Sequence, residues 1–148
     1  MSSQGTGLLS GIRVVEAASM VMVPSVGAAL ADYGAEVIKI EPLEGDLNRR
    51  GHKIPGMPLH DAEYCFLADN RGKRSLSIDL KAPESRDILR RLVSRADIFL
   101  TNHRPKSLAG LGLGWPALQA LNPRLVYAHG TGFGDLGDEI DKPGFDSV

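Results

Sequence analysis

A strand–helix–strand pattern in the first forty residues constrains the fold more than any other feature of this sequence. Residues 11–16 (GIRVVE) and 36–40 (EVIKI) are rich in β-branched side chains and predict two short strands. Between them, Pro24 fits the first turn of a helix, apolar residues follow at helical spacing, and Gly34 is a natural helix stop. A strand, a helix and a second strand within about 30 residues form a βαβ unit, so the two strands are expected to be parallel.

The rest of the chain continues this alternation of strands and helices. Residues 75–80 alternate polar and apolar side chains, as a strand does, and Pro83 opens a helix with one apolar stripe. Further strands are expected at 98–100 and 125–128, short helical turns at 105–109 and 116–121, and a long loop over 42–70. The predicted fold class is therefore α/β, with a doubly wound, mostly parallel, Rossmann-like sheet.

Two further expectations follow for the organisation of the chain. Residues 1–10 form a polar leader, and residues 11–148 form one α/β domain. Residues 12–16, 37–40 and 98–101 are expected to lie in one parallel sheet with their C-terminal ends on one side, because βαβ crossovers are right-handed.

Charge and cysteine content limit the partners and the compartment. The chain has 17 basic and 18 acidic residues, so its net charge of −1 gives no overall attraction to nucleic acid or to an anionic membrane. Cys65 is the only cysteine, which excludes an intramolecular disulfide and suits the cytoplasm. The apolar run 17–31 is similar to a signal peptide, but Glu16 abuts it and Pro24 splits it. We therefore expect a cytoplasmic protein with no nucleic-acid or membrane partner.

Two basic segments are candidates for anion binding. Residues 70–75 (NRGKRS) carry three cations within four residues at the start of a predicted strand, beside a glycine that lets a ligand approach the backbone. Residues 102–106 (NHRPK) follow another predicted strand, where ligands bind in open α/β sheets. On charge alone, a solvated surface turn is the favoured interpretation of residues 70–75, whereas His103 and Arg104 are equally compatible with a surface position and with ligand binding.

Other familiar motifs are excluded by their context. Residues 132–137 match the dinucleotide pattern G-x-G-x-x-G, but an acidic segment and Pro143 follow, so we expect a glycine-rich loop without a helix. The four histidines and Cys65 lack the spacing of a metal site, and no G-x-S-x-G is present. Neither a metal centre nor a hydrolase is expected.

Taken in order along the chain, eleven segments resemble family III CoA-transferases, a group that includes formyl-CoA transferase, the carnitine and bile-acid CoA-transferases and the α-methylacyl-CoA racemases. The segments are 9–16 (LSGIRVVE), 30–42 (LADYGAEVIKIEP), 45–46 (GD), 70–75 (NRGKRS), 79–81 (DLK), 96–98 (ADI), 102–105 (NHRP), 111–114 (LGLG), 122–127 (NPRLVY), 132–134 (GFG) and 143–146 (PGFD). Each match is weak alone, but their common order makes coincidence improbable.

The resemblance implies a binding site for coenzyme A, held as CoA or acyl-CoA substrate without a metal. The residues that it places beside CoA come from three segments: Ser19, Met20, Val21, Met22; Lys73, Arg74; and Asn102, His103, Arg104. Lys73 and Arg74 are expected near the phosphates. The resemblance also implies a carboxylic acid as the second substrate and a homodimer as the full-length protein.

The chemistry implied by the resemblance is acyl transfer through an enzyme carboxylate. That carboxylate attacks an acyl-CoA thioester to give a mixed anhydride, and the CoA thiolate then attacks to leave an enzyme-bound CoA thioester. In the family the nucleophilic aspartate lies some tens of residues beyond the segment that matches 143–146. No catalytic residue is therefore assigned within the chain, Asp146 is interpreted as a structural loop residue, and residues 1–148 alone are expected to be inactive.

Two alternatives remain at this point. An α-methylacyl-CoA racemase needs a histidine and an aspartate for proton transfer, and Phe145 occupies the place of that histidine, which favours the transferase. The second alternative is a CoA-binding or heteromeric partner subunit without catalysis of its own. The sequence also departs from the family at Met20–Met22 and at His103, where small residues and an aromatic residue are usual.

Overall fold

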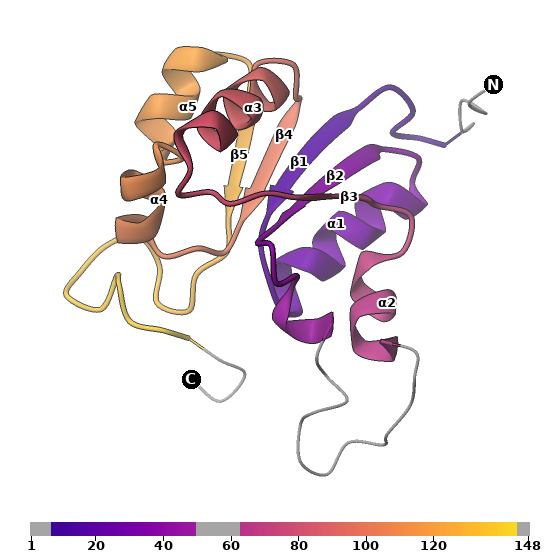
Figure 1. Cartoon of the computed structure of the whole chain (residues 1–148), viewed down its shortest axis with the longest axis horizontal. Helices are drawn as coiled ribbons and strands as arrows, with labels where there is room; N and C mark the ends of the chain where they lie inside the picture. Colours follow the sequence, from indigo (N-terminus) through magenta and orange to yellow (C-terminus); the bar gives the residue numbers. More distant parts are fainter. Residues whose placement is uncertain (1–6, 50–62, 145–148) are drawn as a thin grey trace, which may run out of the picture.

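Five parallel strands form the centre of the computed structural model, which describes residues 7–49 and 63–144 (Figure 1). The sheet has the order β3-β2-β1-β4-β5. Its strands are β1 (Arg13–Ala17), β2 (Glu36–Glu41), β3 (Arg74–Ser77), β4 (Ile98–Thr101) and β5 (Val126–His129). The predicted parallel pairing is confirmed: Val14 lies opposite Val37 of β2 on one side and opposite Ile98 of β4 on the other.

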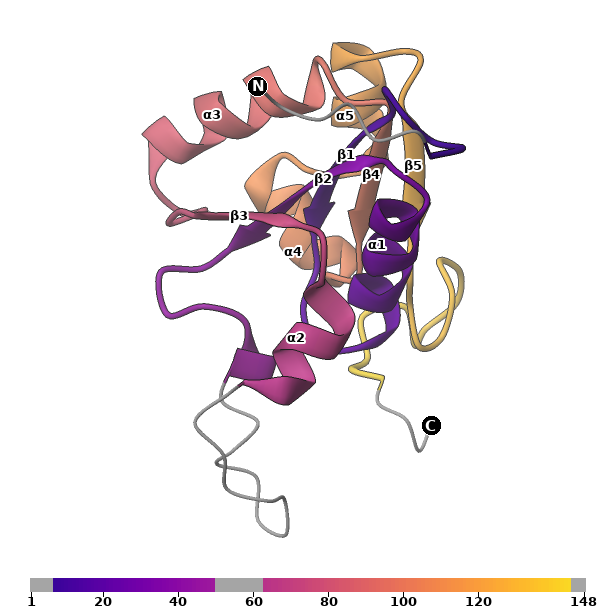
Figure 2. The same ribbon diagram turned by 90° about the vertical axis from the view of Figure 1, so that its right-hand side faces the viewer.

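Helices cover both faces of this sheet, as a doubly wound fold requires. Figure 1 and the perpendicular view in Figure 2 place α1 (Met22–Asp32) and α2 (Tyr64–Asn70) on one face. The helices α3 (Pro83–Val93), α4 (Pro105–Leu111) and α5 (Trp115–Leu121) lie on the other. None of the helices in the described ranges is long and apolar enough to cross a membrane.

Alternation along β1 divides the core into two clusters. Val15 and Ala17 face α3–α5 and belong to a cluster with Phe99 and Leu89. Val14 and Ala18 face α1 and belong to a second cluster with Val23. This period of two places side chains of one strand alternately on the two faces, and it puts the buried Glu16 on the α1 face, between Val14 and Ala18 in the sequence.

The order of the strands creates a topological switch point between β1 and β4, and the space outside the carboxyl ends of these two strands is called the crevice below. The chain passes from β1 to β2 and β3 on one side, and then crosses to β4 and β5 on the other. The loops that follow β1 and β4 therefore leave the sheet on opposite faces. In open α/β sheets, ligands bind outside the carboxyl ends of the strands at such a switch point.

Two local expectations need correction. The loop expected over 42–70 contains the helix α2, which the sequence analysis missed because Tyr64–Asn70 is short and Glu63 provides no side-chain cap. The strand expected over 75–80 covers Arg74–Ser77 instead. It stops early because the carboxylate of Asp79 accepts a hydrogen bond from the amide of Lys81 and begins a turn.

Candidate functional site

The loops after β1 and β4 are joined at the crevice by one side chain. The side-chain oxygen of Asn102 accepts a hydrogen bond from the Ser19 amide at 3.1 Å, and its side-chain nitrogen donates to the Ser19 carbonyl at 2.7 Å. Residues 83 positions apart in the sequence thus form one site. The structure therefore brings together two of the three segments that were expected to contact CoA.

Met20 occupies a strained position in the same loop. Its φ of +67° is in the left-handed region, which costs a residue other than glycine roughly 1–2 kcal/mol. Two side chains hold it there: Asp46 Oδ1 accepts from the Met20 amide at 3.3 Å, and Asn48 Nδ2 donates to the Met20 carbonyl at 3.0 Å. The backbone polar groups of Ser19 and Met20 are thus all bound by the side chains of Asn102, Asp46 and Asn48.

Asp46 and Asn48 are site residues that the sequence analysis did not assign. Both are buried, and both lie in the segment that follows β2. The only signal for Asp46 was the match of residues 45–46 to the family, which gave its side chain no role, and Asn48 lies outside the matched segments. Their contribution depends on a contact between segments 26 residues apart, which residue spacing does not reveal.

Val21 and Met22 form the outer part of the site at the start of α1. These two residues are 46% and 54% exposed, so both present apolar surface to solvent at this end of α1. No side chain caps this end of the helix. The crevice therefore combines an exposed apolar rim with a helix N-terminus.

A buried cluster of charges lies under the loop. Glu16 Oε1 and Lys39 Nζ are 3.0 Å apart on adjacent strands, and Lys39 Nζ also lies 2.9 Å from Asp46 Oδ2. Glu16 Oε2 is 2.7 Å from Lys73 Nζ. These four side chains, Glu16, Lys39, Asp46 and Lys73, are called the buried ion cluster below. Its two carboxylates and two ammonium groups balance in charge.

Lys73 and Arg74 are not brought to the crevice. The side chain of Lys73 is only 2% exposed, and its ammonium group donates to Glu16, to the Pro24 carbonyl and to Asn70. Arg74 is exposed and donates to Glu36 at the amino end of β2, away from the carboxyl ends of the strands. Lys73 therefore belongs to an internal ion pair, and Arg74 lies at the amino ends of the strands.

Burial governs the ionisation of this cluster. Removal from water raises the pKa of Glu16, and the neighbouring Lys39 and Lys73 ammonium groups oppose that shift. Removal from water also lowers the pKa of Lys73, against the opposing effect of Glu16. A buried pair of this kind is costly to break, because the remaining partner would be an uncompensated charge.

His103 and Arg104 line the crevice from the β4 side. Burial lowers the pKa of His103, with smaller contributions from Lys39 and His129. The His103 carbonyl oxygen lies 2.8 Å from Nε2 of His129. The Nδ1 atom of His129 lies 3.1 Å from the Asp135 carboxylate. Arg104 is exposed, and its guanidinium donates to the Asp141 carbonyl at 3.3 Å. Arg104 is therefore an exposed cation in the loop after β4, in contact with the segment that follows β5.

A second group of charged side chains, Arg49, Glu41 and Glu63, holds the backbone of Asp46 in place. Arg49 donates to both carboxylate oxygens of Glu41 at 2.7 and 2.8 Å, lies 3.1 Å from Glu63, and stacks over the ring of Phe66. Glu41 also accepts from the Asp46 amide at 3.0 Å. The position of the Asp46 backbone thus depends on a carboxylate at the end of β2.

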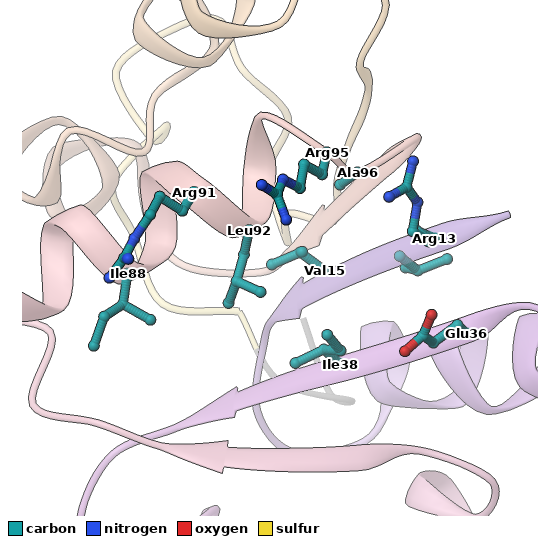
Figure 3. Close-up of a pocket in the computed structure, with 10 residues that line it drawn as sticks. Arg13, Val15, Glu36, Ile38, Ile88, Arg91, Leu92, Arg95 and Ala96 are labelled. Atoms are coloured by element: carbon teal, nitrogen blue, oxygen red, sulfur yellow. The ribbon is translucent and has the colours of Figure 1, made fainter. Parts of the chain in front are cut away.

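Two clefts are found elsewhere on the domain, one at the amino ends of the strands and one that borders the loop after β4. One, of about 400 Å³, lies between α3 and the amino ends of β1 and β2; Arg13, Arg91 and Arg95 surround apolar side chains there (Figure 3). The other, of about 690 Å³, is lined by Trp115, Tyr127 and residues of α4. In residues 7–49 and 63–144, no group of three or more His, Cys, Asp or Glu side chains is arranged to hold a metal ion.

The glycine-rich segment 132–137 follows β5 and is not followed by a helix within the described residues. This agrees with the expected glycine loop. Phe145, which favoured the transferase over the racemase, and Asp146, interpreted as a structural loop residue, lie outside the described residues.

The parallel strand order and the helices on both faces define a doubly wound α/β protein. Residues 9–148 match the family model for CoA-transferase family III, and the chain belongs to that family. It is 43% identical over 144 residues to a succinate–glutarate CoA-transferase of Agrobacterium fabrum, covering 95% of this chain and 36% of the relative.

Further relatives agree. An (R)-2-hydroxy-4-methylpentanoate CoA-transferase of Clostridioides difficile is 39% identical, covering 94% of this chain and 35% of the relative. A crystal structure of a CAIB/BAIF family protein from Brucella suis superposes with a TM-score of 0.87 at 40% identity, covering 97% of this chain and 38% of that one. The chain thus spans about a third of the length of the relatives it matches.

Gly27 of α1 makes room for the buried ion cluster, and its substitution gives a testable prediction. A Cβ atom at this position would lie 1.9 Å from Glu16 Oε2. Gly27→Ala is therefore expected to destabilise the protein by about 1–3 kcal/mol in urea unfolding, although alanine is the better helix former. The matched control is Gly110→Ala in α4, where a Cβ atom meets nothing within 4 Å. Equal stability of the two variants would contradict this account of Gly27.

Glu41 gives a prediction for acid stability. Burial alone would raise the pKa of Glu41, but hydrogen bonds from Arg49, Ser75 and the Asp46 amide lower it to about 2 from 4.5. The unfolded chain then binds the proton more tightly, so this contribution is present above about pH 4.5 and is lost as the pH falls towards about 2. We expect a loss of about 2–3 kcal/mol across that range.

The measurement is the free energy of unfolding at several pH values for the wild type and for Glu41→Gln. The variant should show a shallower decline in acid, because glutamine cannot titrate. Glu84→Gln, which removes an exposed carboxylate from the first turn of α3, serves as the control. A decline as steep in Glu41→Gln as in the control would exclude Glu41 as the source.

Proposed function

We propose that this chain is the CoA-binding part of an acyl-CoA:carboxylate CoA-transferase, with CoA bound in the crevice between Ser19–Met22 and Asn102–Arg104. The observation that carries the proposal is the bridge from Asn102 to both backbone groups of Ser19. It joins the two segments at the switch point of a sheet in a chain that belongs to CoA-transferase family III.

The side chains around the crevice suit the chemistry of CoA. The exposed guanidinium of Arg104 can pair with a phosphate, since planar guanidinium groups bind phosphates through two parallel hydrogen bonds. The exposed side chains of Val21 and Met22 offer apolar contact to the uncharged part of the molecule. His103, half-buried beside Arg104, completes the β4 side of the site.

Lys73 and Arg74 enter this proposal in different roles from Arg104. Lys73 supports the site indirectly, because its ammonium group neutralises Glu16 beneath the loop. Arg74 binds Glu36 at the amino ends of the strands, whereas the crevice lies at their carboxyl ends. Lys73 and Arg74 were the cations expected near the CoA phosphates; of the three cations expected beside CoA, Arg104 is the one that we propose to contact the phosphates directly.

The proposed reaction is the one that the family resemblance implies. An enzyme carboxylate attacks the thioester carbonyl of acyl-CoA, forms an anhydride with the acyl group and releases the CoA thiolate. The thiolate then attacks the enzyme's carbonyl in the anhydride, so that the acyl group leaves as a carboxylate and CoA remains on the enzyme as a thioester. An acceptor carboxylic acid reverses these steps. The proposed site holds CoA while its sulfur is transferred from the acyl group to the enzyme carboxylate and then to the acceptor acid.

We place the nucleophilic carboxylate outside residues 1–148. Covalent acyl transfer requires an activated nucleophile near its orienting groups. The buried carboxylates at the sheet, Glu16, Glu41 and Asp46, are all engaged with lysine or arginine partners. None of these three is presented to the crevice as a free nucleophile, which supports the placement.

CoA binding by the full natural protein tests the assignment of Arg104. Arg104→Ala should weaken the CoA affinity measured by calorimetry by about 1.5–3 kcal/mol, which is roughly 10- to 150-fold, through loss of a charged phosphate contact. Arg124→Ala removes another exposed arginine, from the amino end of β5, and should leave the affinity unchanged. Lys73→Ala should weaken binding as well, together with a lower melting temperature. Unchanged affinity in Arg104→Ala would remove Arg104 from the site.

A turnover assay tests the placement of the nucleophile. Residues 1–148 alone, confirmed by mass, should show no CoA transfer with a panel of acyl-CoA donors and carboxylic acids. The full natural protein should transfer CoA with at least one pair from the same panel. Turnover by the isolated 148 residues would place the nucleophile within them.

A further inference from the structure

Met20 is the residue of the crevice whose conformation most needs an explanation. A methionine gains nothing from a left-handed backbone, and the φ of +67° persists only if its surroundings impose it. The chain on either side of it is fixed by other elements: Ser19 by Asn102, and Val21 by its place as the N-cap of α1. The remaining restraints on Met20 come from Asp46 and Asn48.

We propose that Asp46 and Asn48 are positioning residues, which hold Met20 in its left-handed conformation and thereby set the geometry of the CoA-binding loop. This inference rests on the proposed function for the identity of the ligand. Neither side chain needs to touch CoA. Each acts through the backbone of Met20, one on its amide and the other on its carbonyl.

The hydrogen bonds of Asp46 explain how the restraint is transmitted. Its Oδ1 atom accepts from two amides, Met20 at 3.3 Å and Asn48 at 2.9 Å. Its Oδ2 atom lies 2.9 Å from Lys39 Nζ, in the buried ion cluster. One carboxylate therefore connects the loop, the segment 46–48 and a lysine of the central sheet.

Asn48 completes the restraint as a hydrogen-bond donor, whereas Asp46 is an acceptor. Its side-chain nitrogen donates to the Met20 carbonyl, while its own backbone amide is bound by Asp46. An acceptor on the amide and a donor on the carbonyl fix both peptide planes around Met20. Because both side chains are buried, water cannot readily replace either bond.

The test compares two asparagines that make the same kind of bond at different places. Asn48→Ala removes the donor to Met20. Asn122→Ala is the matched control: Asn122 donates to the carbonyls of Val93 and Ala96 at 3.0 and 2.8 Å, on the far side of α5 from the crevice. Both variants lose side-chain to backbone hydrogen bonds and should lower the melting temperature.

CoA affinity and the resonances of Met20 separate a positioning role from a merely structural one. In the full natural protein, Asn48→Ala should raise the Kd for CoA about tenfold, whereas Asn122→Ala should leave it within about twofold. With ¹³C-methyl-labelled methionine and ¹⁵N-labelled protein, the Met20 methyl and amide signals should move in Asn48→Ala only. Asp46→Asn, which keeps an acceptor for the Met20 amide, should retain more affinity than Asp46→Ala.

The outcomes distinguish this inference from the proposed function. Wild-type protein without CoA affinity would overturn the proposed function, and the Met20 signals would still decide whether Asp46 and Asn48 hold the loop. The positioning role would be overturned if the wild type binds CoA and Asn48→Ala binds it with the same Kd. It would also be overturned if the Met20 signals shift equally in Asn48→Ala and Asn122→Ala.

Discussion

The structure depends on a charge that is buried where the sheet would otherwise be apolar. Glu16 lies near the carboxyl end of β1, and two lysines from other segments neutralise it. Burying ions is costly, and good geometry offsets that cost only when every group is paired. The cluster therefore dictates its surroundings: a glycine in α1 to admit the carboxylate, a lysine opposite it in β2, and Asp46 beyond that lysine. Through Asp46, the charges of the sheet set the backbone of the crevice.

Periodicity in the sequence predicted the architecture because strands and helices are encoded locally. The βαβ pattern over residues 11–40 gave the parallel pairing of β1 and β2, and the Pro83 helix begins where it was expected. α2 was missed because packing rather than capping or propensity holds so short a helix. The strand over 75–80 was predicted too long, since alternation continues past the turn at Asp79.

The site was harder to predict, since its residues meet only after folding. The resemblance to a family supplied Ser19–Met22 and Asn102–Arg104, and the structure joins them. It could not show that Lys73 points inward to Glu16, because a basic run has the same appearance in sequence whether its charges face solvent or a buried carboxylate. Asp46 and Asn48 were missed for the complementary reason: their partners are backbone groups, which every residue possesses.

The ion pair between Arg49 and Glu63 has a consequence for how such chains can vary. The two residues flank segment 50–62, and their side chains meet at 3.1 Å, with Phe66 stacked on the guanidinium. The ends of that segment are thus tied together on the surface of the domain. The entropic cost of a longer connection between fixed ends grows only with the logarithm of its length. Insertions and deletions between Arg49 and Glu63 are therefore expected to cost the protein little stability.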